Sequence, residues 1–197
     1  MVSIGLFIVM MITAQIFYPA FGKPQVFYNL LIDNTFLLVT ATGVTIVIIL
    51  GAIDLSTASV MALVTLLIAT FTKIQLPLGI SIFLALAIGT TFGLLNGLLI
   101  VYFKIQPFIA TLCGMFLSRG IAFLISVESV LIADPTFIKW SEIHIPLIGG
   151  FISLGVVIAL VLWIAMAFMM SYSRLGRCIY AIGGNEKSAM LMGIRVG

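Results

Sequence analysis

Six apolar runs, each long enough or nearly long enough to cross a membrane, dominate the sequence. They lie at residues 3–21, 34–51, 55–72, 78–102, 108–127 and 147–170. A helix needs about 20 apolar residues to cross the hydrocarbon core of a bilayer. Hydrophobic residues make up 63% of the chain and charged residues 8%, which excludes an ordinary soluble domain. The pattern predicts an all-α integral membrane protein, with a bundle of about six transmembrane helices within residues 1–170.

Two short runs lie on either side of GAIDLSTAS. One of them could be a broken or re-entrant helix, which would change the number of crossings. Pro77, Pro107 and Pro146 precede the last three runs and support their boundaries. A proline at the start of a helix sacrifices no hydrogen bond.

The basic residues divide between the two ends of the runs. With an even number of crossings, one side carries Lys104, Arg174, Arg177, Lys187 and Arg195, and the other carries Lys23, Lys73 and Lys139. Cytoplasmic loops carry an excess of lysine and arginine. We therefore expect the first side to be cytoplasmic, in a multi-pass membrane protein.

Asp54 lies in GAIDLSTAS with apolar sequence on both sides. An ionised carboxylate in hydrocarbon needs backbone donors, a cation or water. In one interpretation Asp54 and Ser56 cap the next helix at a tight connection. In the other, a broken helix lines a translocation path. Asn96 in the fourth run either bonds to a neighbouring helix or faces a pore.

Arg119 lies near the middle of the fifth run and costs about 2.5 kcal/mol or more to insert into a membrane. It therefore needs a partner. The candidates are Asp54, Glu128, backbone carbonyls or another chain, and a structural ion pair and a substrate-facing role both remain open.

Gly89, Gly93 and Gly97 recur at every fourth residue of the fourth run. They leave one face of this helix almost without side chains, so another helix can approach closely. This spacing predicts helix packing rather than a ligand site.

The terminal stretch RLGRCIYAIGGNEKSAMLMGIRVG is charged and rich in glycine. Asn185 can cap a helix, Glu186 would lie in its first turn, and Gly193 can end it in a left-handed conformation. The exposed methionines of such a helix suit a groove on a cytoplasmic partner, whereas the alternative is a frayed or interfacial segment.

Several classes of function lack the residues they require. The sequence has no Ser/His/Asp arrangement, HExxH motif or paired membrane aspartates, so we expect no enzyme activity and no metal site. The net charge of +3 is small and scattered, so we expect no nucleic-acid partner.

Three stretches in chain order carry a family likeness: VTIVIILGAIDLSTASV, then FGLLNGLLIVYFKIQPFIATLCGMFLSRGIAFLIS, then GRCIYAIGGNEKSAMLMGI. Through them the chain resembles the permease subunits of binding-protein-dependent ABC importers for monosaccharides, of the ribose-permease type. LISVESVLI and the ending Ser-Ala-x-Leu-Met-Gly-Ile are most similar to subunits associated with galactofuranose uptake. Ala52, Thr57 and Ala58 depart from the family's GGIDLSVGS.

The resemblance implies a division of labour among subunits. Residues 171–197 would form a cytoplasmic coupling segment that contacts an ATP-binding subunit, through Gly183, Asn185, Glu186, Ala189, Gly193 and Ile194. Asp54, Ser56, Asn96, Pro107, Thr111, Arg119 and Gly120 match family-typical membrane positions. The chain itself would hold no cofactor, since ATP is bound by the partner.

The other implied partners are a second permease subunit, identical or related, a periplasmic sugar-binding protein and the lipid bilayer. Family members continue for several more membrane segments, so we expect residues 171–197 to be a truncated internal loop. Two other functions remain open, an ion-gradient-driven secondary transporter, suggested by Asp54 and Arg119, and a membrane assembly protein without transport activity, suggested by the glycine face.

Overall fold

The computed structural model describes residues 2–194 and is mostly helical. Arg195, assigned above to the cytoplasmic side, lies outside the described residues. The elements in chain order are α1 (Val2–Phe17), η1 (Pro19–Gly22), α2 (Pro24–Asp33), α3 (Thr35–Ile49), α4 (Thr57–Lys73), α5 (Leu78–Val101), α6 (Pro107–Ile125), α7 (Pro135–Ser141), β1 (His144–Leu147), β2 (Gly150–Ser153), α8 (Leu154–Tyr172), α9 (Arg174–Gly184) and α10 (Glu186–Leu191).

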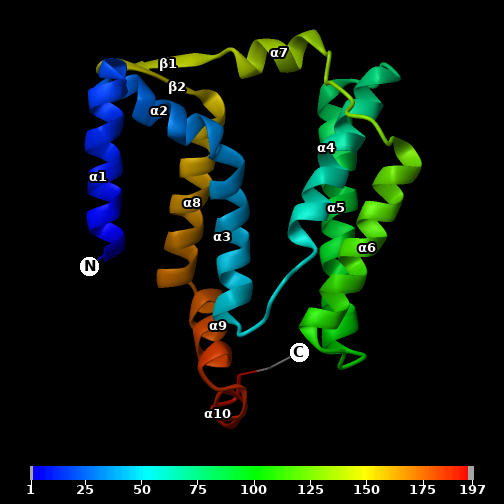
Figure 1. Cartoon of the computed structure of the whole chain (residues 1–197). Helices are drawn as coiled ribbons and strands as arrows, with labels where there is room; N and C mark the ends of the chain where they lie inside the picture. The colour runs from blue at the N-terminus through cyan, green and yellow to red at the C-terminus, as the bar shows by residue number, and fades with distance from the viewer. Residues whose placement is uncertain (1, 195–197) are drawn as a thin grey trace.

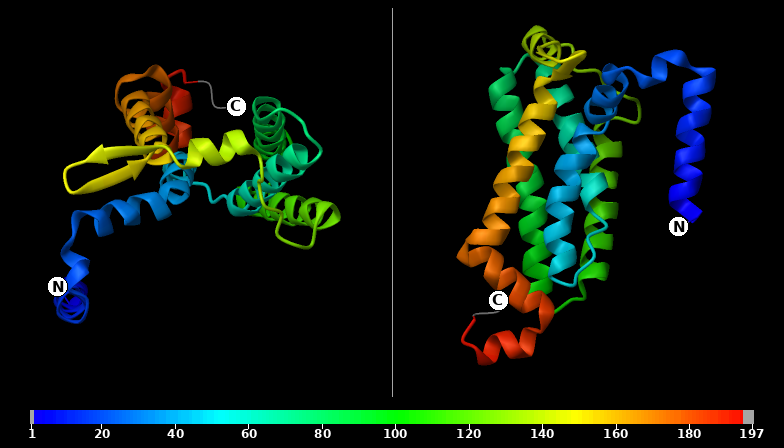
Figure 2. Two further views of the ribbon diagram at one scale, coloured as in Figure 1. Left: turned by 90° about the horizontal axis from the view of Figure 1, so that it is seen from above. Right: turned by 90° about the vertical axis from the view of Figure 1, so that its left-hand side faces the viewer.

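The long helices form two groups, as Figure 1 shows. One group contains α4, α5 and α6, and the other contains α3 and α8, with α9 below them. Residues 50–56 join the groups at one end, and the segment that includes α7 joins them at the other. We call the end with α9 and α10 the inner end, and the end with α2, α7 and the β-strands the outer end. Both views in Figure 2 show α1 standing apart from the groups.

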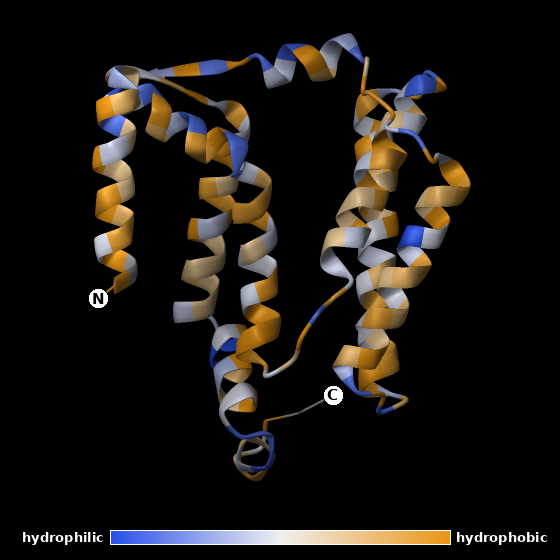
Figure 3. Cartoon of the chain, viewed as in Figure 1, coloured by the Kyte–Doolittle hydropathy of each residue, from blue (hydrophilic) through white to orange (hydrophobic). Residues whose placement is uncertain are grey.

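The largest core lies in the first group. Leu63 and Leu67 of α4 pack there against Ala85 and Phe92 of α5. Most other apolar side chains face outward: only 22% of the most apolar stretch of α5, and 17% of that of α8, is buried within the chain. Hydrophobic residues cover the long helices and hydrophilic residues gather toward both ends (Figure 3). This distribution suits a surface in contact with lipid.

Three helices, α5, α6 and α8, are long and apolar enough to cross a membrane. The pair α2 and α3 is a fourth candidate, bent by 55° at Asn34. At the bend the Asn34 amide donates to the Leu30 carbonyl at 2.7 Å, and the Thr35 hydroxyl donates to the Leu31 carbonyl at 2.8 Å. The described residues thus supply three or four spans by length and composition, and the six predicted from the sequence stay a prediction.

The start of the last predicted run differs from the structure. Residues 144–153 form an antiparallel hairpin, in which Leu147 pairs with Gly150, and α8 begins only at Leu154. The expectation of a purely helical chain is wrong at this point. The hairpin turns at Gly149, whose φ of +80° is a conformation that favours glycine.

Helix α2 holds the hairpin in place. The side-chain amide of Gln25 accepts from the Phe151 N–H at 2.8 Å and donates to the Phe151 carbonyl at 3.2 Å. The Tyr28 hydroxyl donates to the Ile148 carbonyl at 3.1 Å. Gln25 therefore pairs with the outer edge of β2 as a neighbouring strand would.

The predicted glycine face of α5 makes one close approach in the described residues. A Cβ atom at Gly89 would lie 2.9 Å from Cγ2 of Val64, so α4 and α5 are close at this level. Gly93 and Gly97 meet nothing within 4 Å among the described residues. Their role in helix packing stays a prediction.

Candidate functional site

The inner end begins with a sharp turn between α8 and α9. The Ser173 hydroxyl accepts a hydrogen bond from the Gly176 N–H at 3.1 Å and so caps α9. A Cβ atom at Gly176 would lie 2.6 Å from the Met170 Cα, so only glycine allows the chain to fold back this tightly. The turn fixes the direction in which α9 leaves the apolar helix.

Helix α10 has the ends that the sequence predicts. The Asn185 side chain accepts from the Ser188 N–H at 2.9 Å, and Glu186 lies in the first turn. At the other end Gly193 has φ +82°, its N–H donates to the Met190 carbonyl at 2.9 Å, and the Ile194 N–H donates to the Ala189 carbonyl at 3.1 Å. These two bonds are those of a Schellman motif.

The side chains of α10 divide into a buried and an exposed set. Ala189 is fully buried, whereas Leu191 is 90% exposed and Met192 is 70% exposed. An apolar side chain held in solvent at the end of a short capped helix is available for a partner. We name α9 and α10 together, residues 174–191, the inner-end segment.

Gly183 of the inner-end segment packs against the end of α3. A Cβ atom there would lie 2.8 Å from the carbonyl carbon of Ile49, closer still to its oxygen, and 3.3 Å from the Cα of Leu50. The neighbouring Gly184 meets nothing within 4 Å among the described residues. The contact at Gly183 is thus one backbone against another at the end of α3.

Asp54 lies half-buried in the segment that follows α3. One of its carboxylate oxygens accepts from the Ser56 N–H at 2.8 Å and from the Ser56 hydroxyl at 2.7 Å. The other accepts from the Thr57 hydroxyl at 3.0 Å. Donors within three residues therefore satisfy this carboxylate. The two interpretations of the sequence, a helix cap and a broken helix along a translocation path, both stay predictions.

Ser56 links Asp54 to α5 instead of capping α4. Its side chain makes no capping bond at the start of α4. Its hydroxyl donates to Asp54 and accepts from the side-chain amide of Asn96 at 3.1 Å. Ser56 and Asn96 are 3% and 8% exposed, so this bridge between α4 and α5 is buried.

Helix α6 contributes the remaining contacts of this site. A Cβ atom at Gly114 would lie 2.7 Å from the Asn96 side-chain oxygen, so the absence of a side chain makes room for Asn96. The Thr111 hydroxyl donates to the Ile53 carbonyl at 3.3 Å, and the Ser118 hydroxyl donates to that of Ser59 at 2.8 Å. We name the group the polar cluster; its members are Asp54, Ser56, Ser59, Asn96, Thr111 and Ser118.

The sequence reasoning missed Ser59, Gly114 and Ser118. A signal was present, because Thr111, Gly114 and Ser118 recur at intervals of three and four, the spacing of one helix face. Among the described residues, every buried side-chain nitrogen and oxygen has a hydrogen-bond partner. The buried polar atoms of the polar cluster are therefore not left without partners.

Arg119 is not part of the polar cluster. It is exposed on α6, one residue beyond the buried Ser118. Successive helical residues point about 100° apart, so Arg119 is directed away from the interface with α4. Asp54, one partner considered for it, uses its oxygens on serine and threonine instead.

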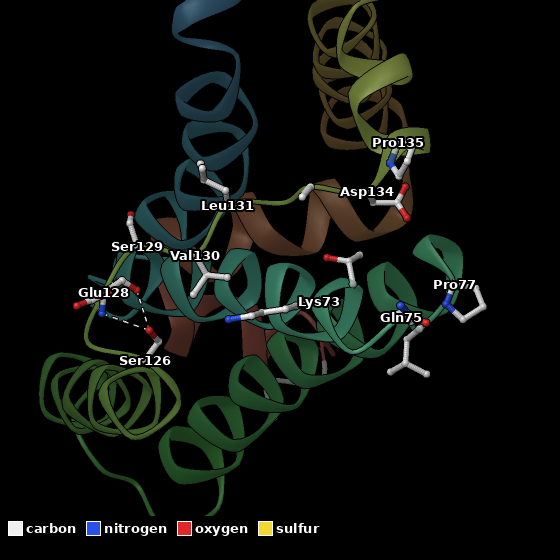
Figure 4. Close-up of a pocket in the computed structure, with 13 residues that line it drawn as sticks. Lys73, Gln75, Pro77, Ser126, Glu128, Ser129, Val130, Leu131, Asp134 and Pro135 are labelled. Carbon is white, nitrogen blue, oxygen red and sulfur yellow. Dashed lines mark hydrogen bonds between the residues drawn. The ribbon is translucent and has the colours of Figure 1, made fainter.

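A hollow lies at the outer end. It has a volume of about 790 Å³ and lies between the end of α4 and the segment that leads to α7. Lys73, Glu128 and Asp134 contribute charged groups to its lining. In Figure 4 the amino end of Lys73 points toward the side that carries Glu128, whose backbone is bonded to Ser126. We name this hollow the outer cavity.

Comparison with known proteins places the chain in a family. The family model described as branched-chain amino acid transport system / permease component matches residues 26–197. The chain belongs to this permease family. No solved structure matches it.

Similar curated proteins of Escherichia coli (strain K12) include the inner membrane ABC transporter permease protein YjfF, which is 40% identical over 98% of the chain and 59% of the relative. The ribose import permease protein RbsC is 32% identical over 90% of the chain and 56% of the relative. The galactofuranose transporter permease protein YtfT is 35% identical over 78% and 44%. The resemblance to monosaccharide ABC permeases is confirmed. The chain spans a little over half the length of the first two relatives.

Proposed function

We propose that this chain forms part of the transmembrane permease subunit of a binding-protein-dependent ABC importer for a monosaccharide in a bacterial inner membrane. ATP would be hydrolysed by a separate subunit that binds at the inner end. The observation that carries the proposal is the inner-end segment in a chain that belongs to a permease family. It is a capped pair of short helices, of which α9 packs on α8 and α3.

The charges support this orientation. Arg174, Arg177 and Lys187 lie in the inner-end segment, and Lys104 lies in the loop after α5. The outer end has fewer basic residues, and it carries the acidic residues Asp33, Glu128, Asp134 and Glu142. The positive-inside rule favours a cytoplasmic inner end. The outer cavity would then face the periplasm and the sugar-binding protein.

The inner-end segment has the chemistry of a docking helix. Met190, Leu191 and Met192 present flexible apolar side chains that suit a groove on an ATP-binding subunit. Asn185, Glu186 and Gly193 would act by holding this helix in shape, and Ala189 by its buried packing. A second permease subunit, identical or related, would complete the translocation path.

The six-span topology belongs to this proposal. The 17 residues of α4 give a helix of about 26 Å, short of a hydrocarbon core of about 30 Å. Residues 50–56 lie at its lower end and would complete the crossing as a broken helix. Irregular backbone at such a depth needs internal hydrogen bonds, and the polar cluster supplies them.

The test is ATP-dependent uptake by the full-length protein. It would be reconstituted in proteoliposomes with its ATP-binding subunit and binding protein, and offered radiolabelled ribose, galactofuranose or fructose. We expect uptake of at least one sugar that requires hydrolysable ATP and persists when an ionophore collapses ion gradients. A complex whose ATP-binding subunit lacks its phosphate-binding lysine is the control. Uptake that follows the ion gradient at constant ATP would instead support secondary transport.

A further inference from the structure

At Gly183 the end of α9 lies directly against the end of α3. The contact there is between backbone atoms of α9 and those of Ile49 and Leu50. Backbone atoms cannot yield by changing rotamer, as the tip of a side chain can. A displacement of the end of α9 therefore displaces the end of α3 as well.

The end of α3 leads at once into a reversal of the chain. Gly51 has φ +80°, its N–H donates to the Ile48 carbonyl at 2.9 Å, and the Ala52 N–H donates to the Val47 carbonyl at 3.1 Å. These bonds form a Schellman motif that ends the helix. Beyond it, residues 52–56 have no regular helix.

The other end of this stretch is fastened to the second helix group. The Ile53 carbonyl accepts from Thr111 of α6, and the Ser56 hydroxyl accepts from Asn96 of α5. Residues 50–56 therefore have one end against α9 and the other in the polar cluster.

In the described part of the chain, residues 50–56 are the short covalent connection between these two places. The main helix contacts stay within each group, and α9 packs on α3 and α8. The remaining covalent route from α6 to α8 passes through α7 and the hairpin at the outer end (Figure 1).

We propose that Gly183 and residues 50–56 are positioning elements that transmit movement of the inner-end segment to the polar cluster, and so to α5 and α6. This inference rests on the proposed function for its direction, from the ATP-binding subunit into the membrane. In this proposal residues 50–56 take one of two positions and so pass the movement on, and the backbone rotates at Gly51.

The first test compares two neighbouring glycines in the full-length transporter. Gly183→Ala adds a methyl group against the Ile49 carbonyl, whereas Gly184→Ala adds one into open space. We expect the number of sugars imported per ATP hydrolysed to fall at least about fivefold in Gly183→Ala, the low end of usual coupling energies. Gly184→Ala keeps the ratio of the unmodified protein. Equal ratios in the two variants overturn the inference.

The second test needs no transport. Amide hydrogen exchange of the complex in nanodiscs is measured with and without a non-hydrolysable ATP analogue. We expect the analogue to change exchange at residues 52–56 in the unmodified protein and in Gly184→Ala, but not in Gly183→Ala. A response in all three, or in none, overturns the inference. The unmodified protein could show the expected change in exchange at residues 52–56 and yet import no sugar. That result would count against the proposed function and leave the inference standing.

A third variant covers a Gly183→Ala protein that fails to fold. Ser56→Ala removes the bond to Asn96 at the other end of the segment and leaves α9 untouched. The response to the analogue should then persist at Ala52 and disappear at Asn96. Thr111 keeps its bond to the Ile53 carbonyl and should still respond. If Asn96 responds as in the unmodified protein, the Ser56–Asn96 bond does not transmit the movement and the inference is wrong.

Discussion

Asn96 and Gly114 provide the sharpest quantitative test of the polar cluster. Asn96→Ala removes the bond to Ser56, worth about 0.6 kcal/mol for an average interhelical bond in a membrane. It also empties roughly 30 Å³ of buried space, which adds about 0.7 kcal/mol at ~24 cal/mol per Å³. We expect a loss of about 1.3 kcal/mol in the free energy of unfolding.

Gly114→Ala acts on the same space from the other helix. Its Cβ would lie 2.7 Å from the Asn96 side-chain oxygen, and overpacking of this kind costs about 1–3 kcal/mol. An alanine in mid-helix also gains up to about 1 kcal/mol over glycine. In the Asn96→Ala background, Gly114→Ala no longer overpacks this space but still gains the helix propensity of alanine.

The double-mutant cycle isolates this contact, because the helix-propensity gain is present in both backgrounds and cancels. We expect a coupling of about 1 kcal/mol or more, with Gly114→Ala better tolerated when Asn96 is absent. The assay is SDS-induced unfolding of the full-length protein in mixed micelles, followed by tryptophan fluorescence. Thr91→Ala on the exposed face of α5 is the control. Additivity within about 0.5 kcal/mol would refute the packing of Asn96 on Gly114.

Four further substitutions test local features. Gly193→Ala forces a side chain into a left-handed conformation at roughly 1 kcal/mol, so it should weaken binding of the ATP-binding subunit about fivefold in a titration. Gln25→Ala removes both bonds to the Phe151 backbone, and amide exchange at Phe151 should accelerate; unchanged exchange would contradict the pairing. Ser118→Ala should cost about 0.6 kcal/mol in the same unfolding assay. Ser59→Ala should cost more, because the Ser59 hydroxyl also donates to the Ser56 carbonyl at 2.7 Å, and the double variant should lose about 0.6 kcal/mol less than the sum of the two because they share one bond.

Local chemistry explains which parts of the fold could be predicted. Both ends of α10 follow from Asn185 and Gly193, because a cap and a left-handed glycine act within a few residues. Likewise Pro77 and Pro107 stand at the starts of α5 and α6, as predicted. Pro146 was expected to open a helix and instead lies in β1, since a strand edge also tolerates a missing N–H.

The hairpin and the polar cluster could not be predicted in the same way, because their bonds join distant residues. Gln25 and Phe151 are 126 positions apart, and Ser59 and Ser118 are 59 apart. A helix that meets lipid on most sides has apolar residues all round, so its periodicity does not identify the face toward its neighbour. Polarity alone selected Asp54 and Asn96, and only the structure shows that Ser56 connects them.

The departures from the family motif fall where glycine is not needed. Of the two positions that are Gly-Gly in the family, only Gly51 has a positive φ, and Ala52 takes an ordinary backbone conformation. Ala58 lies in the first turn of α4, where the family's glycine would loosen the helix by up to about 1 kcal/mol, whereas Thr57 stands in place of a valine. Ala58 therefore stiffens the start of α4, and Gly51 is the glycine that remains in the connection. A rotation passed on from α9 would be confined to Gly51, and α4 would move with the polar cluster as a unit.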